Sequence, residues 1–315
     1  MEGLYGIVDV VDPADASVVE ITRALLGDRE AGGHDGASVV QLRAKHASTS
    51  QRALWAEQML GPCRAAGVPL IVNDDFEAAI AAGADGLHLG QDDHGADDID
   101  AVRTRARARG RGDLQIGLST HDLGQLREAG RQGPDYLALG PIGPTQSKLD
   151  PDPVVGFTAL LDGCRLAPRP LVAIGGMDLE RGRRALEYGA SAVAVIGALR
   201  FDDVSQIRTT AMTMARAFRQ AAAPVELDEV HRRIPVFPAQ QLHELARWGD
   251  ALGVHIGLGL PARFAPWVED GRALYRPCDV IDLIAALGKL PNETWDQWRA
   301  RAKDDDGPLV QLRRL

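Results

Sequence analysis

The chain has 315 residues, more than a single hydrophobic core usually organises, so we expect one domain with an extension, or two domains. Hydrophobic residues make up 45% of it and charged residues 25%, as in ordinary globular proteins. The formal net charge of −9 argues against a nucleic-acid-binding protein, and the three scattered cysteines match neither a disulfide framework nor a zinc site.

The sequence carries no recognisable targeting or membrane signal. No basic segment precedes a long apolar run near the first residue, so we expect no signal peptide. No run of about 18 uncharged apolar residues occurs either, and we expect no membrane-spanning helix. The prediction is a cytoplasmic protein whose thiols stay reduced.

Eight short apolar runs recur between the first residues and position 196. They are rich in β-branched residues and nearly continuous in hydrophobicity, which is typical of strands covered on both faces. In chain order the runs are Leu4–Val10, Ser38–Leu42, Pro69–Val72, Gly86–Leu89, Leu114–Leu118, Tyr136–Leu139, Pro170–Ile174 and Ala192–Ile196.

Helical patterns separate these runs. Examples are Ala53–Ala66, weakened by its Gly61-Pro62 pair, then Leu179–Tyr188 and Val204–Ala221. Strands that alternate with helices predict a parallel sheet, and eight units within about 200 residues fit a closed (β/α)₈ barrel, the TIM barrel. An open, doubly wound sheet is the alternative. It is disfavoured because polar residues follow nearly every strand rather than one switch point.

The second predicted strand ends in three polar residues on one face. Strand alternation places Gln41, Arg43 and Lys45 together, pointing toward the barrel mouth, where the active sites of such barrels lie. Two cations and an amide on one face suit an anion such as a diphosphate. The alternative is a solvated strand end with one internal salt bridge.

Carboxylates follow the third and fourth strands. Asp74 comes after the third, and Asp92 and Asp93 come after the fourth, so adjacent strand tips can share a Mg²⁺ ion. The alternatives are a helix N-cap for Asp74 and a solvated acidic loop for the other two. His88 alternates with leucines inside its strand, so we interpret it as a core histidine with satisfied hydrogen bonds and leave it out of the site.

The remaining strands end in hydroxyls and glycines. Ser119 can donate to a phosphate oxygen, and the long loop over residues 140–148 is typical of a substrate-binding lid. Gly176 and Gly197 follow the last two strands, where close backbone approach usually forms the phosphate site of such barrels.

Together these motifs resemble the thiamine-phosphate synthase family. The matching segments cover residues 1 to about 200 and touch every strand: LYGIVD, QLRAK, VNDDFEAAIAAGADGLHLGQDD, GLSTH, DYLALGPIGPTQSK, VAIGGM and SAVAVIGAL. Members of that family are transferases that join a pyrimidine diphosphate to a thiazole phosphate, giving thiamine phosphate and pyrophosphate. The resemblance therefore implies this reaction of thiamine biosynthesis, with Mg²⁺ as cofactor.

The resemblance also implies the roles of individual residues. The pyrimidine diphosphate would be held by polar residues from several strand ends: Gln41, Arg43, Lys45, Asn73, Ser119 and Lys148. The Mg²⁺ ligands would be Asp74 and Asp93. The thiazole phosphate would lie against hydroxyl, amide and backbone groups: Thr145, Gln146, Ser147, Gly176, Ile196 and Gly197.

The implied chemistry needs no general base, because the thiazole nitrogen is already a nucleophile. Breaking the methylene C–O bond leaves positive charge on the pyrimidine and negative charge on the pyrophosphate. Arg43, Ser119 and Lys148, with Mg²⁺, would stabilise that leaving charge and act as the catalytic groups.

Three positions depart from the family pattern. Gly143 stands where an aromatic residue is usual, Ser147 where Thr is usual, and Gly197 where Ser is usual. The last change removes a side-chain donor, so we expect weaker thiazole phosphate binding without loss of the chemistry. A thiazole tautomerase with the same barrel is the alternative function, disfavoured by the paired carboxylates and Lys148. A non-catalytic regulatory barrel is a further alternative, which a metal titration would test.

The resemblance does not extend to the C-terminal part. We therefore divide the chain into a barrel domain, 1–222, and an extension of unknown function, 223–315. The extension is predicted to be mainly helical, with helices over Pro238–Leu252, Asp279–Leu287 and Asn292–Ala302. It would form a small domain that packs on the barrel or mediates assembly into a homo-oligomer. Alternatively, it would be a separate binding module with Trp267, Trp295 and Trp298 as contact residues.

Overall fold

The chain forms two compact units, Met1–Ala221 and Ala222–Leu315, and each is described by itself. The computed structural model describes residues 2–11, 17–27, 29–30, 33–90, 99–145, 152–233, 267–269, 272–274 and 297. Within these ranges, no helix is both long enough and apolar enough to cross a membrane.

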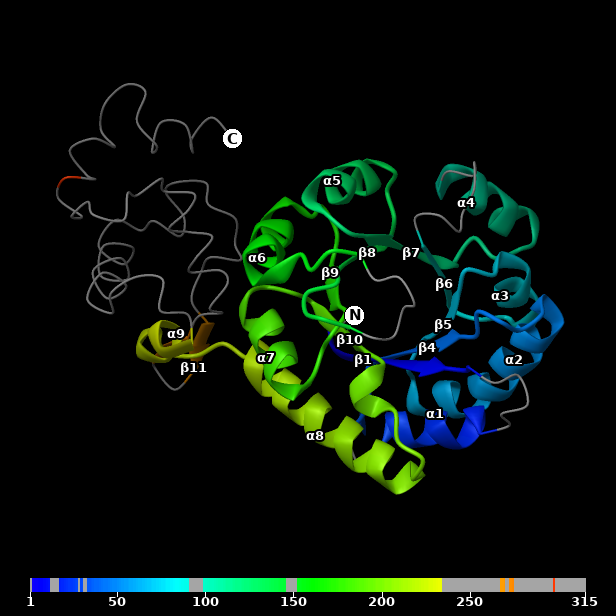
Figure 1. Ribbon diagram of the computed structural model, residues 1–315, viewed down its shortest axis with the longest axis horizontal. Helices are drawn as coiled ribbons and strands as arrows, with labels where there is room; N and C mark the ends of the chain where they lie inside the picture. The colour runs from blue at the N-terminus through cyan, green and yellow to red at the C-terminus, as the bar shows by residue number, and fades with distance from the viewer. Residues whose placement is uncertain are drawn as a thin grey trace. The chain divides into compact units, whose positions relative to one another are not determined.

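The first unit is a closed barrel of eight parallel strands in the order β1-β10-β9-β8-β7-β6-β5-β4 (Figure 1). The predicted barrel is therefore confirmed, and each predicted apolar run overlaps one of its strands, with bounds that differ by at most two residues at either end. The strands are β1 (Gly3–Asp9), β4 (Val39–Arg43), β5 (Leu70–Asn73), β6 (Gly86–Leu89), β7 (Gln115–Thr120), β8 (Tyr136–Leu139), β9 (Leu171–Ile174) and β10 (Ala192–Val195).

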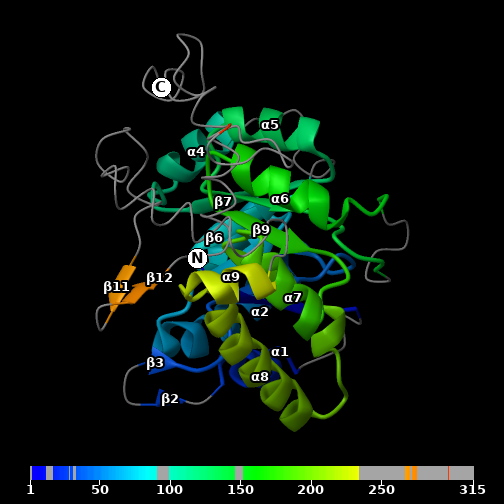
Figure 2. The ribbon, with the colours of Figure 1, turned by 90° about the vertical axis from the view of Figure 1, so that its left-hand side faces the viewer.

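Helices surround this barrel (Figure 1). They are α1 (Val18–Leu26), α2 (Thr49–Ala66), α3 (Phe76–Ala82), α4 (Ile99–Ala108), α5 (Leu123–Arg131), α6 (Gly156–Leu166), α7 (Leu179–Glu187) and α8 (Val204–Ala222). Figures 1 and 2 show α7 and α8 side by side, and the Phe218 ring lies so close to Gly182 that a Cβ there would be 2.2 Å away. A short 3₁₀ helix, η1 (Gly197–Leu199), follows β10, and a hairpin of β2 (Arg29–Glu30) and β3 (Gly33–His34) follows α1.

The helix α2 runs unbroken through the Gly61-Pro62 pair that weakened its prediction. Its buried side chains, Trp55, Met59 and Cys63, recur every four residues and continue past the proline. Tertiary packing of this stripe therefore outweighs the local cost of Pro62.

The core has two layers. Side chains of one strand parity, such as Leu4 and Val8 of β1, pack between the strands and the helices. Those of the other parity, such as Tyr5 and Ile7, fill the barrel interior with residues from the facing strands. This alternation determines which side chains can reach a site at the end of the barrel.

The second unit is described only in part. It contains α9 (Leu227–Arg233) and an antiparallel hairpin of β11 (Trp267–Glu269) and β12 (Arg272–Leu274), which the sequence did not predict. The predicted helices over 238–252 and 279–287 lie outside the described residues. Of the predicted helix over 292–302, only Gln297 is described, and it is helical.

Candidate active site

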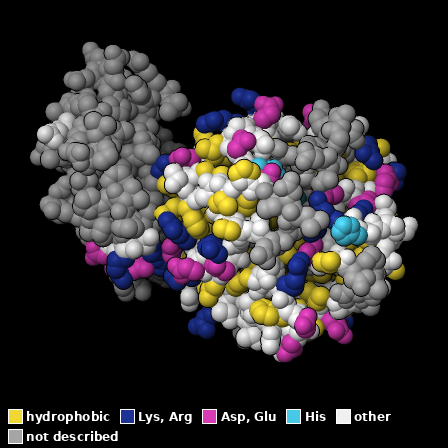
Figure 3. All heavy atoms as spheres, viewed as in Figure 1, with side chains coloured by type: hydrophobic (Ala, Val, Ile, Leu, Met, Phe, Trp, Pro, Cys, Tyr) yellow, Lys and Arg dark blue, Asp and Glu magenta, His cyan; other side chains and the backbone are white. Residues whose placement is uncertain are grey.

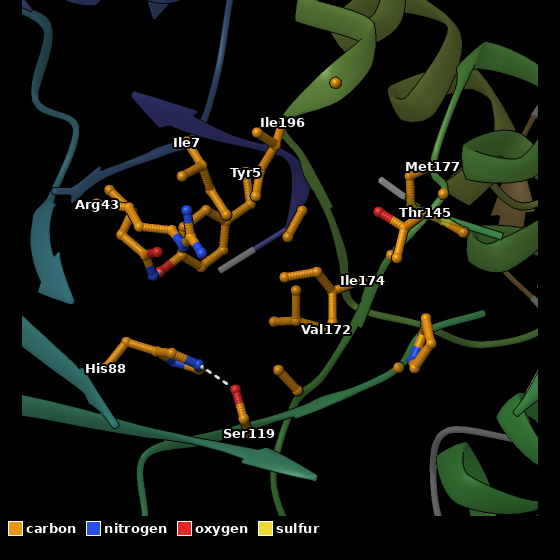
Figure 4. Close-up of a pocket in the computed structure, with 18 of the residues that line it drawn as sticks. Tyr5, Ile7, Arg43, His88, Ser119, Thr145, Val172, Ile174, Met177 and Ile196 are labelled. Atoms are coloured by element: carbon orange, nitrogen blue, oxygen red, sulfur yellow. Dashed lines mark hydrogen bonds between the residues drawn. The ribbon is translucent and has the colours of Figure 1, made fainter. Parts of the chain in front are cut away.

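A pocket of about 670 Å³ lies at the carboxyl end of the barrel, and each of the eight strands contributes to its lining. Figure 4 shows Arg43, His88 and Ser119 on one side of this pocket and Thr145 and Met177 on the other. Apolar residues, among them Val172 and Ile174, lie between the two sides (Figure 4). The volume and the mixture of apolar walls with a few polar groups are typical of a small-molecule site.

Ten of the predicted site residues line this pocket: Gln41, Arg43, Lys45, Asn73, Asp74, Ser119, Thr145, Gly176, Ile196 and Gly197. The other four predicted residues, Asp93, Gln146, Ser147 and Lys148, lie outside the described part of the chain. The structure thus brings together strand-end residues that are more than 150 positions apart in the sequence. Their individual roles remain predictions.

The cationic side of the pocket is held by a buried carboxylate. Asp9, whose side chain is 6% exposed, forms ion pairs with Arg43 and with Arg200. Both arginines line the pocket, from either side of β1. The internal salt bridge considered as the alternative for Arg43 therefore exists, and it fixes the guanidinium at the pocket wall. The sequence did not predict Arg200.

The Asp74 carboxylate lines the pocket at the end of β5 and adopts a positive φ of 62°. Its Oδ1 accepts a hydrogen bond from the Gly90 N–H at 3.1 Å, and the Asn73 amide donates to Oδ2. The Nζ of Lys45 lies 3.9 Å from Oδ2. A side chain held in such a sparsely populated backbone conformation is typical of a functional position.

The N-cap alternative for Asp74 is wrong, because its neighbour Asp75 caps α3. The Asp75 carboxylate accepts from the Ala78 N–H at 2.9 Å and from Arg52 at 2.8 Å. Burial alone would raise the pKa of Asp75, but these hydrogen bonds, with one from Thr49, hold it below its usual value. Asp74 is thereby left to face the pocket.

A buried polar network lies beneath the cationic side. His88 contacts the Tyr136 hydroxyl through Nδ1 at 3.0 Å and the Ser119 hydroxyl through Nε2 at 2.8 Å. The prediction that its hydrogen bonds are satisfied is confirmed, but His88 also lines the pocket. Tyr5 and Tyr136, which the sequence did not predict, line the pocket from β1 and β8. Strand parity is the signal that could have found Tyr5, because it lies two residues before Ile7 and four before Asp9 on the same face of β1.

The opposite side of the pocket is built from backbone. Gly175 and Gly176 have φ values of 88° and 65°. A Cβ on Gly176 would lie 2.4 Å from the Pro144 carbonyl oxygen. The Gly143 N–H donates to the Gly175 carbonyl at 3.0 Å, so the loops after β8 and β9 pack directly against each other. Only glycine permits this approach.

At Gly143, where the family pattern has an aromatic residue, the side chain of an arginine lies alongside the backbone. A Cβ on Gly143 would lie 3.2 Å from Nε of Arg181, which lines the pocket from the first turn of α7. Arg181 pairs with Asp178 at 2.7 Å and donates to the Gly176 carbonyl at 3.2 Å. Arg181 therefore occupies the space beside Gly143.

On the face shown in Figure 3, the described basic and acidic side chains do not form separate positive and negative patches. Basic and acidic groups are interspersed there over the described surface of the barrel unit. Among the described residues, the arginine and lysine side chains that line the pocket and could select an anion are Arg43, Lys45, Arg181 and Arg200.

This fold and this pocket define a (β/α)₈-barrel enzyme whose site suits phosphorylated substrates. The sequence model of the family described as thiamine monophosphate synthase matches residues 4–199. The chain belongs to this family and is an enzyme of thiamine biosynthesis, a transferase.

Individual relatives agree with this assignment. A thiamine-phosphate synthase of Chlorobium phaeovibrioides is 44% identical over 164 residues, which cover 52% of this chain and 75% of that protein. Another from Bacillus velezensis is 37% identical over 168 residues, covering 52% of this chain and 71% of that protein. The solved structure of a thiamine phosphate pyrophosphorylase from Pyrococcus furiosus is similar at a TM-score of 0.58 and 26% identity, covering 70% of this chain and 97% of that one.

Proposed function

We propose that the barrel unit joins an aminopyrimidine diphosphate to a thiazole phosphate, releasing thiamine phosphate and pyrophosphate. One observation carries the proposal: a single pocket has a cationic end formed by side chains and a second end formed by glycine backbone, with an apolar wall between them. Two anionic groups at opposite ends, with flat rings against the apolar wall, would place the reacting atoms between Ser119 and Thr145.

The cationic end would take the diphosphate. Arg43 and Lys45 would supply charge, and Asn73 and Ser119 would supply donors, from the ends of β4, β5 and β7. The carbonyl of the buried Gln41 amide can accept from the pyrimidine amino group, because its nitrogen already donates to Tyr5. Lys148, from the loop after β8, completes the predicted set.

Asp74 is suited to help hold a Mg²⁺ ion. Mg²⁺ is usually held by one or two carboxylates together with substrate phosphates, and Asp74 offers one carboxylate beside the cationic end. Within the described ranges, no three His, Cys, Asp or Glu side chains cluster as a protein-only metal site would. Asp93 is the proposed second ligand. A bound Mg²⁺ would neutralise charge on the diphosphate.

The backbone end would take the thiazole phosphate. Gly176, Ile196 and Gly197 line the pocket after β9 and β10, and their N–H groups would donate to the phosphate. Thr145 adds a hydroxyl, and Gln146 and Ser147 would extend this wall. Backbone N–H groups bind phosphate without a side-chain entropy cost, which offsets the missing hydroxyl at Gly197.

The reaction then follows from positioning and charge. The methylene C–O bond breaks, and its electron pair leaves with the pyrophosphate. The thiazole nitrogen donates its lone pair to the methylene carbon and forms the C–N bond. Arg43, Ser119 and Lys148 would stabilise the leaving charge, and the apolar wall would exclude water from the cationic intermediate. No residue needs to remove a proton.

A coupling assay on the purified full chain tests this proposal. Both substrates and Mg²⁺ are supplied, and thiamine phosphate and pyrophosphate are quantified with Asp93→Ala alongside. We expect equal amounts of the two products from the wild type and a collapse in the variant. A folded, Mg²⁺-binding wild type that yields no product would contradict the synthase reaction, and a change in the thiazole alone would indicate the tautomerase.

Both proposed substrates are small anions, which supports a cytoplasmic location for the protein.

A further inference from the structure

Five side chains form one continuous hydrogen-bonded chain across the barrel interior. Nε2 of Gln41 donates to the Tyr5 hydroxyl at 2.8 Å, which lies 3.0 Å from the Tyr136 hydroxyl. Tyr136 in turn contacts Nδ1 of His88 at 3.0 Å, and Nε2 of His88 contacts the Ser119 hydroxyl at 2.8 Å. The first four residues are at most 6% exposed, so water does not replace these bonds. All five residues line the pocket, and Ser119 is the one of the five that is partly exposed.

The Gln41 end of this network determines which group donates the proton in each of its hydrogen bonds. An amide nitrogen can only donate, so the Tyr5 oxygen is an acceptor toward Gln41. The hydroxyl proton of Tyr5 then needs an acceptor, and its other hydrogen-bond partner is the Tyr136 oxygen. A buried hydroxyl proton without an acceptor is costly, so Tyr5 donates to Tyr136. By the same reasoning, Tyr136 donates to Nδ1 of His88.

The tautomer of the His88 imidazole then determines how the Ser119 hydroxyl is oriented in the pocket. Burial lowers the pKa of His88 to about 4, so the ring is neutral near pH 7 and has one N–H. Because Nδ1 accepts from Tyr136, the proton is on Nε2, and Nε2 donates to the Ser119 oxygen. Burial also raises the pKa values of Tyr5 and Tyr136, so both phenols keep their protons. The Ser119 proton is thereby directed away from His88.

We infer that His88 is a positioning residue: held by Tyr136, it fixes the Ser119 hydroxyl as a hydrogen-bond donor to an anionic oxygen in the pocket. The identity of that anion as the diphosphate rests on the proposed function, whereas the direction of the hydrogen bonds does not. With the other tautomer, Ser119 would donate to His88 and turn a lone pair toward the anion, which would repel it. The network thus converts a neutral serine into a donor of fixed direction.

Nitrogen-15 NMR of the histidine rings tests the tautomer without any assay of activity. The His88 signals are identified by their loss in His88→Gln, among the eight histidines of the chain. In the wild type we expect a neutral ring protonated on Nε2 between about pH 5.5 and 8. In Tyr136→Phe we expect a mixture of tautomers. A ring protonated on Nδ1, or one that becomes an imidazolium near pH 6, would overturn the inference.

Kinetics test the consequence for the reaction. We expect Tyr136→Phe and His88→Ala to lower kcat on the order of 10- to 100-fold, with a smaller change in the KM of the pyrimidine diphosphate. His88→Gln, whose amide can still donate to Ser119, should recover part of the loss. Tyr188→Phe, a matched change outside the pocket, should leave kcat unchanged.

A double-mutant cycle separates positioning from a structural role. In a Ser119→Ala background, His88→Ala should cause no further loss, because its effect passes through that hydroxyl. Equal losses with and without Ser119, or a loss that follows the melting temperature of each variant, would overturn the inference. If the wild type makes no product, the proposed function fails while the NMR result still decides the direction of the network.

Discussion

The two ends of the pocket, each proposed to bind an anion, are built by different means. At the β4–β7 end the groups are side chains, and other side chains hold them: Asp9 fixes Arg43, and His88 contacts Ser119. At the β8–β10 end, Gly175 and Gly176 at positive φ bring the backbone to the pocket wall, where we propose that N–H groups bind the phosphate. The comparison teaches that one end should lose function when a charge or donor is removed. The other should lose function when a Cβ is added at Gly175 or Gly176, where the backbone φ is positive and the neighbouring loop is in contact.

The largest effect is expected at the side-chain end. Arg43→Ala should lower kcat/KM for the pyrimidine diphosphate on the order of 100- to 1000-fold, because it removes a fixed cation where the leaving charge grows. Steady-state kinetics with that substrate varied would measure this change. Arg165→Ala, on the outer helix α6, is the matched control and should be silent. A comparable loss in the control would contradict a specific role for Arg43.

The buried network of the side-chain end also predicts a dependence of stability on pH. Folding lowers the pKa of His88 from 6.5 to about 4, so the unfolded chain binds an extra proton between these values. The stabilisation is therefore present above pH 6.5 and is lost as the pH falls toward 4, by about 3 kcal/mol. Urea unfolding at pH 7 and pH 4 should show a larger drop for the wild type than for His88→Gln. Equal drops would contradict a buried neutral imidazole.

The backbone end is tested by adding one methyl group. Gly176→Ala should raise the KM of the thiazole phosphate more than about 10-fold and cost about 1–3 kcal/mol of stability, since its φ of 65° is strained and its Cβ would lie 2.4 Å from Pro144 O. Gly133→Ala is the matched control: its φ is 71°, but a Cβ there would meet nothing within 4 Å. It should lose some stability and keep its KM. Normal thiazole phosphate binding in Gly176→Ala would contradict the backbone account.

The smallest effect is expected from a variant that adds a side-chain hydrogen-bond donor at the backbone end. Gly197→Ser should lower the KM of the thiazole phosphate by about 2- to 10-fold, the worth of one hydrogen bond. Varying that substrate in the coupling assay would measure the gain. A rise in KM would mean that this end has no room for a side chain, and that the glycine is required rather than merely permitted.

The strands and ten of the residues that line the described pocket could be predicted from the sequence because both follow from burial. Continuous apolar runs such as the one around Val72 have no other stable place than a strand covered on both faces. Polar residues directly after such runs, such as Arg43 and Asp74, must then meet at one end of the barrel. The order of apolar runs and polar residues along the sequence is enough to predict that these side chains lie at the same end of the barrel.

The rest depends on contacts that sequence spacing does not encode. Tyr136 has the pattern of a core residue, and its role depends on His88 and Tyr5 from other strands. Arg200 follows a 3₁₀ turn that redirects the chain, so strand parity could not place it. The choice of Asp75 over Asp74 as helix cap depends on a backbone angle. The continuation of α2 depends on packing against its neighbours.

The most direct test of the central claim varies both substrates in the coupling assay for the wild type, Arg43→Ala and Gly176→Ala. The account predicts thiamine phosphate and pyrophosphate in equal amounts from the wild type. It predicts weaker use of the pyrimidine diphosphate in the first variant and of the thiazole phosphate in the second. No product from the folded wild type, or two variants that impair the same substrate, would contradict a pocket with two separate anion-binding ends.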